Sequence, residues 1–364
     1  MRYLSDFRDA AACAALAERI RRLAHGAGEM QFMEFCGGHT HAIARHGLRS
    51  LLPENVRLVS GPGCPVCVSS QGDVDRAVAL AGRDGVTVVT FGDMMQVPGS
   101  EGSLQEARAL GADVRVVYSP ADALRLAVDC PGRQVVFLGV GFETTAPAVA
   151  ATVLQAQRQG ITNYSVLSLH KLTPPAMRAV LDAGEVRLDG VIGPGHVSTV
   201  IGAGAWRFLP EEHGLGCAVA GFEPADLLLA VAELVRMVVE GRPEVANCYR
   251  RSVSDGGNSR ALAVMEQAFQ VVDADWRGLG VVPASGLHFR PELADLDAGA
   301  RLALPKLESR EPAGCRCGEV LRGVLEPSQC PLFGSACTPE SPVGPCMVST
   351  EGACSAHYLL REAG

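Results

Sequence analysis

The chain has 364 residues, is 48% hydrophobic and 20% charged, and carries a net charge of −8. Its length exceeds that of one ordinary core and predicts two or three domains. The negative balance argues against a broad electrostatic grip on nucleic acid or on an anionic membrane. The first residues lack the apolar core of a signal peptide, and no apolar run approaches the roughly 20 residues needed to cross a bilayer. We therefore expect a cytoplasmic protein whose partners include neither nucleic acid nor membrane.

Strand-like and helix-like runs alternate along most of the chain. Residues 8–25 are rich in alanine and leucine at helical spacing and predict a helix. Strands are expected at 31–35, 56–60, 86–91, 114–118, 135–140, 164–169, 190–192 and 218–221. Further helices are expected at 73–81, 104–110, 121–128, 146–157, 175–183 and 225–239. This alternation predicts an α/β fold with mainly parallel strands and crossover helices.

Two α/β lobes facing a cleft explain eight strands better than one sheet does. A Gly-Pro-Gly turn follows a strand in each half of this region, at 61–63 and at 193–195. We place the lobes at 31–130 and 131–224. Beyond about residue 240 the pattern changes, with a helix expected at 258–271, a strand with turn signals at 276–289, and a linker at 291–313.

Two cysteine motifs lie where predicted strands end. Cys36-Gly37-Gly38-His39-Thr40-His41 follows the strand at 31–35, and Gly61-Pro62-Gly63-Cys64-Pro65-Val66-Cys67 follows the strand at 56–60. Ligands of open α/β sheets bind at the carboxyl ends of the strands, so three thiols and two imidazoles are expected to converge on one cleft. Thiolate and imidazole together suit iron, zinc or copper.

The Cys-x-x-Cys spacing of Cys64 and Cys67 allows either a disulfide or two thiolates on one metal. The helix expected from Asp73 can lower a thiol pKa by its positive N-terminal end. A structural zinc half-site and two buried thiols are the alternatives. The Gly-Pro-Gly turn and the neighbouring Cys36 favour redox chemistry.

Other polar residues also follow predicted strands. Gly141 to Thr145 open a helix whose amides can hold an anion, with Glu143 placed for proton transfer. A simple helix cap by Thr144 or Thr145 explains this segment equally well. His196, Asp93 and His170-Lys171 share the position just past a strand, although a lone histidine is more often structural. The chain has no Gly-x-Gly-x-x-Gly or Walker sequence, so nothing supports a nucleotide site.

Thirteen cysteines are many for a reducing compartment, where a disulfide framework is not expected. Isolated ones such as Cys130 and Cys217 fit a role as small buried hydrophobes. The last fifty residues hold six: Cys315, Cys317, Cys330, Cys337, Cys346 and Cys354. Four thiolates from such loops can bind zinc or a 4Fe–4S cluster. Their wide, irregular spacing slightly favours the cluster and leaves two cysteines over.

Together these features resemble the HypD-type maturation factors of NiFe-hydrogenases. The matching stretches run through nearly the whole chain: 33–41, 61–68, 139–145, 193–197, 219–224 and the cysteine-rich end. The resemblance implies two Rossmann-like lobes and a third domain made from both chain ends, residues 1–30 and 225–364, carrying an iron–sulfur cluster. It also implies a role in assembling the Fe(CN)2CO group with a HypC-type chaperone and a HypE-type cyanide donor, which a HypF-type carbamoyltransferase charges.

The resemblance further implies roles for individual residues. Cys36 would hold the iron of the Fe(CN)2CO group, and Cys64 and Cys67 would form the redox pair. The 4Fe–4S ligands would be Cys317, Cys330, Cys337 and Cys354, with Cys315 as the competitor for the first position and Cys346 dispensable. His39, His41, Glu143 and His196 would manage protons or bind the cyanide nitrogens. Gln96 stands where the family usually has arginine, which leaves the role of its loop open.

Two other hypotheses fit the same residues. One is a thiol–disulfide oxidoreductase with a structural zinc site in the cysteine-rich end, which predicts zinc without labile sulfide. The other is a pure scaffold whose thiols bind iron, in which Cys64 and Cys67 supply no electrons.

Overall fold

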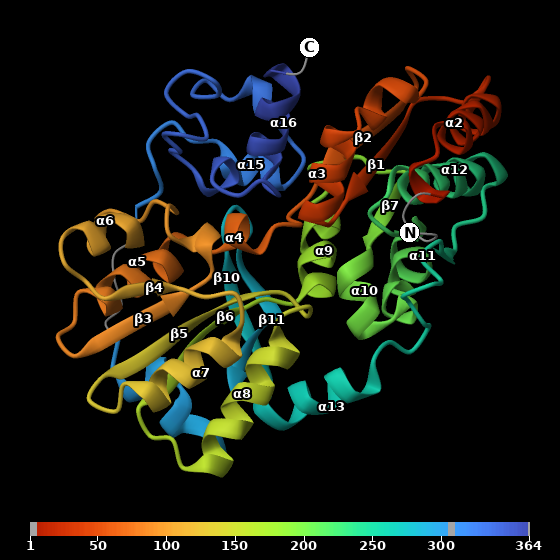
Figure 1. The fold of residues 1–364 in the computed structure, drawn as a ribbon. Coiled ribbons are helices and arrows are strands. Elements are labelled where there is room, and N and C mark those ends of the chain that lie inside the picture. The colour runs from red at the N-terminus through yellow and green to blue at the C-terminus, as the bar shows by residue number, and fades with distance from the viewer. Residues whose placement is uncertain (1–5, 305–309, 363–364) are drawn as a thin grey trace.

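A computed structural model describes residues 6–304 and 310–362. These residues form a five-stranded sheet, a four-stranded sheet and a two-stranded hairpin (Figure 1). Every strand pair within the two larger sheets is parallel. The predicted α/β class is therefore confirmed, and each of the eight predicted strands is present to within about two residues.

The five-stranded sheet has the order β2-β1-β7-β8-β9. Its strands are β1 (Met30–Glu34), β2 (Val56–Ser60), β7 (Gly190–Pro194), β8 (Gly216–Ala220) and β9 (Val245–Asn247). Helix α12 (Pro224–Glu240) covers one face, and α2 (Ala10–Ala24) packs beside it. Phe32, Ile192 and Leu228 are buried in the core between them. The helices α3 (Gly37–Arg45), α4 (Pro65–Val68), α10 (Gly195–Ile201) and α11 (Phe208–His213) belong to its connections.

The four-stranded sheet has the order β4-β3-β5-β6. Its strands are β3 (Val86–Thr90), β4 (Val114–Val116), β5 (Gln134–Gly141) and β6 (Tyr164–His170). Its helices are α5 (Gln71–Ala81), α6 (Leu104–Ala109), α7 (Pro120–Asp129), α8 (Ala146–Gln159) and α9 (Thr173–Asp182). β5 is buried along almost its whole length, which explains its near-continuous Val, Phe and Leu sequence.

The predicted partition of strands at residue 130 does not match this pairing. β3 to β6 form a sheet of their own, inserted between β2 and β7, and residue 130 falls between α7 and β5 of that one sheet. Strand partners are chosen by long-range pairing: β1 pairs with β7, and Gln31 N–H donates to Asp189 Oδ2 at 2.8 Å. Both Gly-Pro-Gly turns therefore end strands of the same sheet, instead of marking one lobe each.

The segments between β9 and the cysteine-rich end pack mainly against the four-stranded sheet and its helices. Helix α13 (Ser259–Ala268) packs on α8, and the hairpin of β10 (Phe269–Trp276) and β11 (Gly280–Phe289) packs beside β6. The helix predicted at 258–271 thus ends at Ala268, because Phe269 to Trp276 pair with β11 as a strand. Within the predicted linker, Pro291–Leu296 form a 3-10 helix and α14 spans Ala298–Arg301, while 305–309 lie outside the described residues.

The cysteine-rich end, residues 310–362, is here called the tail. It contains α15 (Cys317–Leu321), α16 (Ala353–Glu362) and a 3-10 turn at Pro345–Met347. It packs on α3 and α4, away from α2 at the other chain end (Figure 1). Its buried residues Val320, Leu321 and Met347 belong to the core that both sheets share. Within the described residues, every helix is too short or too polar to cross a bilayer.

Candidate functional site

The two cysteine motifs meet at the carboxyl edge of the five-stranded sheet. Cys36 follows β1 and Cys64 follows β2, and these strands are neighbours. Gly37 N–H donates to Gly63 O at 2.8 Å, so the two motifs contact each other through their backbones. The ends of β7 and β8, which carry His196 and Phe222, continue the same edge.

Cys36 lies at the start of α3, and its carbonyl accepts hydrogen bonds from the N–H groups of His39 and Thr40 at 2.9 and 3.0 Å. Its own N–H donates to the buried Glu34 carboxylate at 3.1 Å. The side chain is 8% exposed. Burial, and then the nearby Glu351 carboxylate, raise the pKa of the thiol to about 12. The free thiol is therefore neutral at pH 7, and a bound cation would be needed to stabilise the thiolate.

Gly63 is essential to this geometry. A methyl group there would lie 2.3 Å from Cys36 N and 2.6 Å from its Cα, both rigid backbone atoms. We expect Gly63→Ala to lower the free energy of unfolding by about 1–3 kcal/mol, the usual cost of overpacking. Urea unfolding measures it. Gly132→Ala is the control, because nothing lies within 4 Å of the added methyl group, and an equal loss in both variants would contradict the prediction.

Cys64 and Cys67 span the short helix α4. Cys67 N–H donates to Cys64 Sγ at 3.3 Å, and Cys64 is the N-terminal cap of the helix. Burial raises the pKa of the Cys67 thiol, and the Cys64 sulfur raises it further. The helix end was expected to lower a thiol pKa here, but for Cys67 burial acts in the opposite direction and outweighs it.

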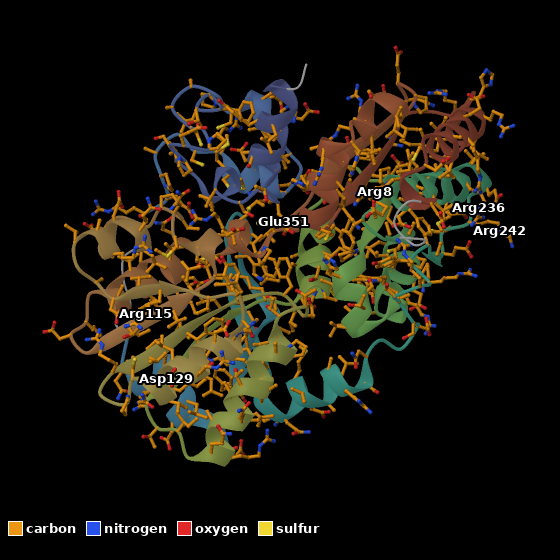
Figure 2. The ribbon with its side chains drawn as sticks, in the orientation of Figure 1. Arg8, Arg115, Asp129, Arg236, Arg242 and Glu351 are labelled. Atoms are coloured by element: carbon orange, nitrogen blue, oxygen red, sulfur yellow. A yellow bond between two sulfur atoms is a disulfide. The ribbon has the colours of Figure 1, made fainter. Side chains whose placement is uncertain are left out.

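The tail covers these thiols. The Cys67 thiol donates a hydrogen bond to Pro345 O, with Sγ 3.7 Å from the oxygen. The Cys354 sulfur is close enough to raise the pKa of Cys67. Cys64 is 3% exposed and Cys67 is fully buried. The three thiols are therefore enclosed, where the sequence predicted a cleft. Glu351 of the tail lies against Gly37, where the tail meets α3 (Figure 2).

Two of the predicted histidines flank one aromatic ring. The ring of His196 stacks on Phe222 with centroids 3.8 Å apart, and His39 lies 4.9 Å from Phe222 on centroids. His39 is fully buried; its Nε2 lies 3.2 Å from Ala220 O, and its Nδ1 has no hydrogen-bond partner in the described part of the chain. Burial lowers the pKa of His39 to about 4 and also lowers that of His196, so both are neutral at pH 7. His41 instead reaches the tail, with Nδ1 3.3 Å from Thr350 O.

Glu143 lies at the edge of the other sheet. Its two carboxylate oxygens accept from Thr173 N–H and Thr173 Oγ1–H, each at 2.8 Å, and so cap the first turn of α9. The structure does not bring it to Cys36 by any contact among the described residues. Burial raises its pKa to about 6, and the bonds from Thr173 only partly offset this. The carboxyl group is capable of holding a proton, but here it positions a helix.

The raised pKa of Glu143 predicts a pH-dependent contribution to stability. The folded state binds this proton more tightly than the unfolded state, so the free energy of unfolding falls as pH rises from about 4.5 to about 6. The fall amounts to about 2 kcal/mol, at 1.36 kcal/mol per pKa unit. Glu143→Gln keeps an acceptor oxygen for Thr173 N–H, and its amide N–H can donate to Thr173 Oγ1 in place of the second bond. It does not titrate and should remove this part of the slope. Urea unfolding of both proteins between pH 4 and 8 measures it, and parallel curves would contradict the assignment.

Six cysteines of the tail line one small apolar pocket: Cys315, Cys317, Cys330, Cys337, Cys346 and Cys354. Cys317 and Cys346 are paired as a disulfide. Cys337 and Cys330 both raise the pKa of Cys315, and all three raise that of Cys354, although burial is the largest cause for both. Four unpaired sulfurs therefore lie near one another. As the side chains stand, the described residues contain no group of three or more Cys, His, Asp or Glu arranged to hold a metal ion.

Sequence reasoning missed three residues of this region. Glu34 was visible as one carboxylate inside an apolar strand. Phe222 lies in the matching stretch 219–224. Its contact with both histidines, however, requires the ends of β1, β7 and β8 to lie side by side, which the sequence does not indicate. Glu351 had no sequence signal, because only folding of the tail brings it to Gly37, where a methyl group would lie 2.6 Å from the Glu351 Cβ.

The fold and the site define a class: parallel α/β proteins with buried thiols at a sheet edge, covered by a cysteine-rich tail. Residues 11–361 match the HypD family, described as the hydrogenase formation hypA family. The chain is 49% identical to hydrogenase maturation factor HypD2 of Bradyrhizobium diazoefficiens, with 98% of this chain and 96% of that protein aligned. It is 50% identical to HypD of Azotobacter vinelandii over 98% and 96%, and 44% identical to HypD of Escherichia coli over 100% and 99%. The chain belongs to the HypD family of hydrogenase maturation factors.

Proposed function

We propose that this protein is the scaffold and redox factor on which the Fe(CN)2CO group of NiFe-hydrogenases is assembled. The observation that supports this proposal is that the two cysteine motifs and the tail meet in one place. The cysteine motifs at the ends of β1 and β2 contact each other through their backbones, and the tail with six cysteines covers both. A metal anchor, a dithiol and a further sulfur-rich site thus occupy one enclosed region in a chain of the HypD family.

Cys36 would hold the iron, which is cargo here. A soft thiolate suits iron that carries cyanide and carbon monoxide. The buried site keeps water away, and the high pKa of the free thiol means that iron binding must release its proton. A HypC-type chaperone would share this iron. His196 is neutral and lies at the same edge, where its ring N–H can donate to a cyanide nitrogen. The one N–H of neutral His39 donates to Ala220 O, so His39 would instead pack beside the site.

Cys64 and Cys67 would supply electrons. Moving cyanide from a thiocyanate-like donor on a HypE-type partner, charged by a HypF-type carbamoyltransferase, consumes two electrons. A dithiol supplies two electrons and two protons on becoming a disulfide. Cys67 N–H already contacts Cys64 Sγ at 3.3 Å, so the two side chains are close enough for this pairing with little movement.

The tail fits a 4Fe–4S cluster, which takes four cysteine ligands and would exchange single electrons. The pocket is apolar and is lined by all six cysteines of the tail. Cys317, predicted as a ligand, is paired with Cys346, so we assign the ligands as Cys315, Cys330, Cys337 and Cys354. Val343 N–H donates to Cys337 Sγ at 3.3 Å, the kind of bond that stabilises a ligating thiolate.

A thiol–disulfide oxidoreductase with a structural zinc is the second candidate, because a Cys-x-x-Cys pair next to a four-cysteine site fits it as well. It differs in metal content, since it requires zinc without labile sulfide. It also differs in reactivity, since it would reduce generic disulfides without any partner.

The test is an infrared spectrum of the protein purified without oxygen together with its HypC-type partner. We expect cyanide and carbonyl stretching bands that are absent from the same complex carrying Cys36→Ala. Iron in the intact complex without these bands would contradict the assembly role, and zinc without sulfide would favour the oxidoreductase.

A further inference from the structure

Arg277 is a buried cation in the turn between β10 and β11, 3% exposed. Figure 1 shows this turn reaching α4 and the tail. Neither the metal anchor nor the dithiol uses Arg277, yet burying a guanidinium is costly unless it is paired and hydrogen-bonded. Its contacts therefore need an explanation.

On one side Arg277 holds the segment that follows Cys67. Its backbone N–H donates to Val68 O at 3.0 Å, and its Nε donates to Ser69 O at the same distance. A terminal nitrogen donates to Gln71 Oε1 at 2.9 Å. These bonds fix the C-terminal end of α4 and the first residue of α5, and so fix where the Cys64/Cys67 helix points.

On the other side Arg277 faces the tail. Its second terminal nitrogen pairs with Glu311, which is mostly exposed. Gly278 touches α15, since a methyl group at Gly278 would lie 2.5 Å from Gly318 Cα. Arg322 of the tail donates to Gly278 O at 2.6 Å. The turn that holds Arg277 thus packs against α15, which begins at Cys317, two residues after Cys315.

We infer that Arg277 is a positioning residue that joins the dithiol helix to the tail and raises the reduction potential of the tail cluster. The inference rests on the proposed 4Fe–4S site. A cluster held by four thiolates becomes more negative when it accepts an electron, so a fixed positive charge beside it favours the reduced form. Glu311 is exposed to solvent and offsets this charge only in part, because water screens it.

Redox titration of the anaerobic full-length protein, followed by electron paramagnetic resonance, tests the inference. Arg277→Met removes the charge and keeps the length of the side chain. We expect the equilibrium constant for cluster reduction to fall about tenfold, or about 59 mV for one electron. Arg277→Lys keeps the charge and should restore most of the shift, which a purely structural role would not do.

Two further variants serve as controls. Lys171→Met removes another buried cation, which pairs with Asp73 at 3.0 Å and donates to Asp275 O at 2.7 Å, both outside the tail; it should leave the potential unchanged. Glu311→Gln changes an exposed residue without endangering the fold and should move the potential upward, opposite to Arg277→Met.

The outcomes separate the two proposals. Wild-type protein without iron and labile sulfide in the tail would overturn the proposed cluster and this inference with it. A wild-type cluster whose potential is the same in Arg277→Met, or equally lowered in Arg277→Lys, would overturn the inference alone. If Arg277→Met does not fold, Arg277→Gln removes the same charge and keeps a donor for Ser69 O, and an unchanged potential in that variant has the same consequence.

Discussion

Cells whose only copy carries Cys67→Ser should lose hydrogenase activity completely, to the background of cells that lack the protein. Serine is close to cysteine in size, so the buried site between α4 and the Pro345 turn stays filled. It cannot form a disulfide with Cys64, so this pair can no longer supply the two electrons that we propose for cyanide transfer. Hydrogenase activity in extracts of the complemented cells measures the effect.

Cys217→Ala is the matched control. Cys217 is as deeply buried as Cys67, but it lies within β8, and the thiol close enough to raise its pKa is that of Cys248, outside the proposed redox pair. Its loss should cost packing and leave maturation intact. Activity retained in Cys67→Ser would show that the dithiol supplies no electrons, and would favour the scaffold whose thiols bind iron alone.

Local patterns were sufficient to find the strands. β3, β5 and β6 are runs of β-branched and aromatic residues bounded by glycine or charged turns, and their burial on both faces explains why they read as continuous apolar segments. The helices of this sheet were placed nearly as well, and two of them, α5 and α6, begin at capping boxes formed by Ser70 and Ser103.

The grouping of strands into sheets was not predictable in the same way. No sequence feature near Gly190 indicates that β7 pairs with β1, more than 150 residues earlier in the chain. The pairing depends on long-range contacts, such as the bond between Asp189 and Gln31. A chain with eight similar strands permits several partitions. The break at Pro131-Gly132 was a plausible turn signal, but it ends α7 within the four-stranded sheet.

The same distinction between local patterns and long-range packing applies to the candidate site. Residues at strand ends, such as Cys36 and Cys64, were placed together by the rule that ligands bind at the carboxyl edge of parallel strands. Glu143 lies at the edge of the other sheet, where it caps α9. Its position and its role therefore depend on how the strands are divided between the two sheets. The enclosure by the tail depends on packing between distant segments, which no local spacing encodes.

The second large effect is on the iron and sulfide content of the tail, and it depends on which cysteines bind the proposed cluster. Cys315→Ser and Cys354→Ser should each lose the iron and labile sulfide of the tail, while Cys317→Ser and Cys346→Ser should retain them. The reason is the pairing of Cys317 with Cys346, which leaves the other four sulfurs as mutual neighbours in the pocket. Iron and sulfide analysis of anaerobically purified variants measures this, with the absorbance of the cluster as a second signal.

The four variants form their own control, because each replaces one buried or half-buried sulfur of the same pocket by oxygen. Any general damage to the tail would lower the metal content in all of them alike. Loss in Cys317→Ser with retention in Cys315→Ser would restore the ligand set expected from the sequence. The Cys317–Cys346 disulfide would then be a pairing that cluster binding excludes.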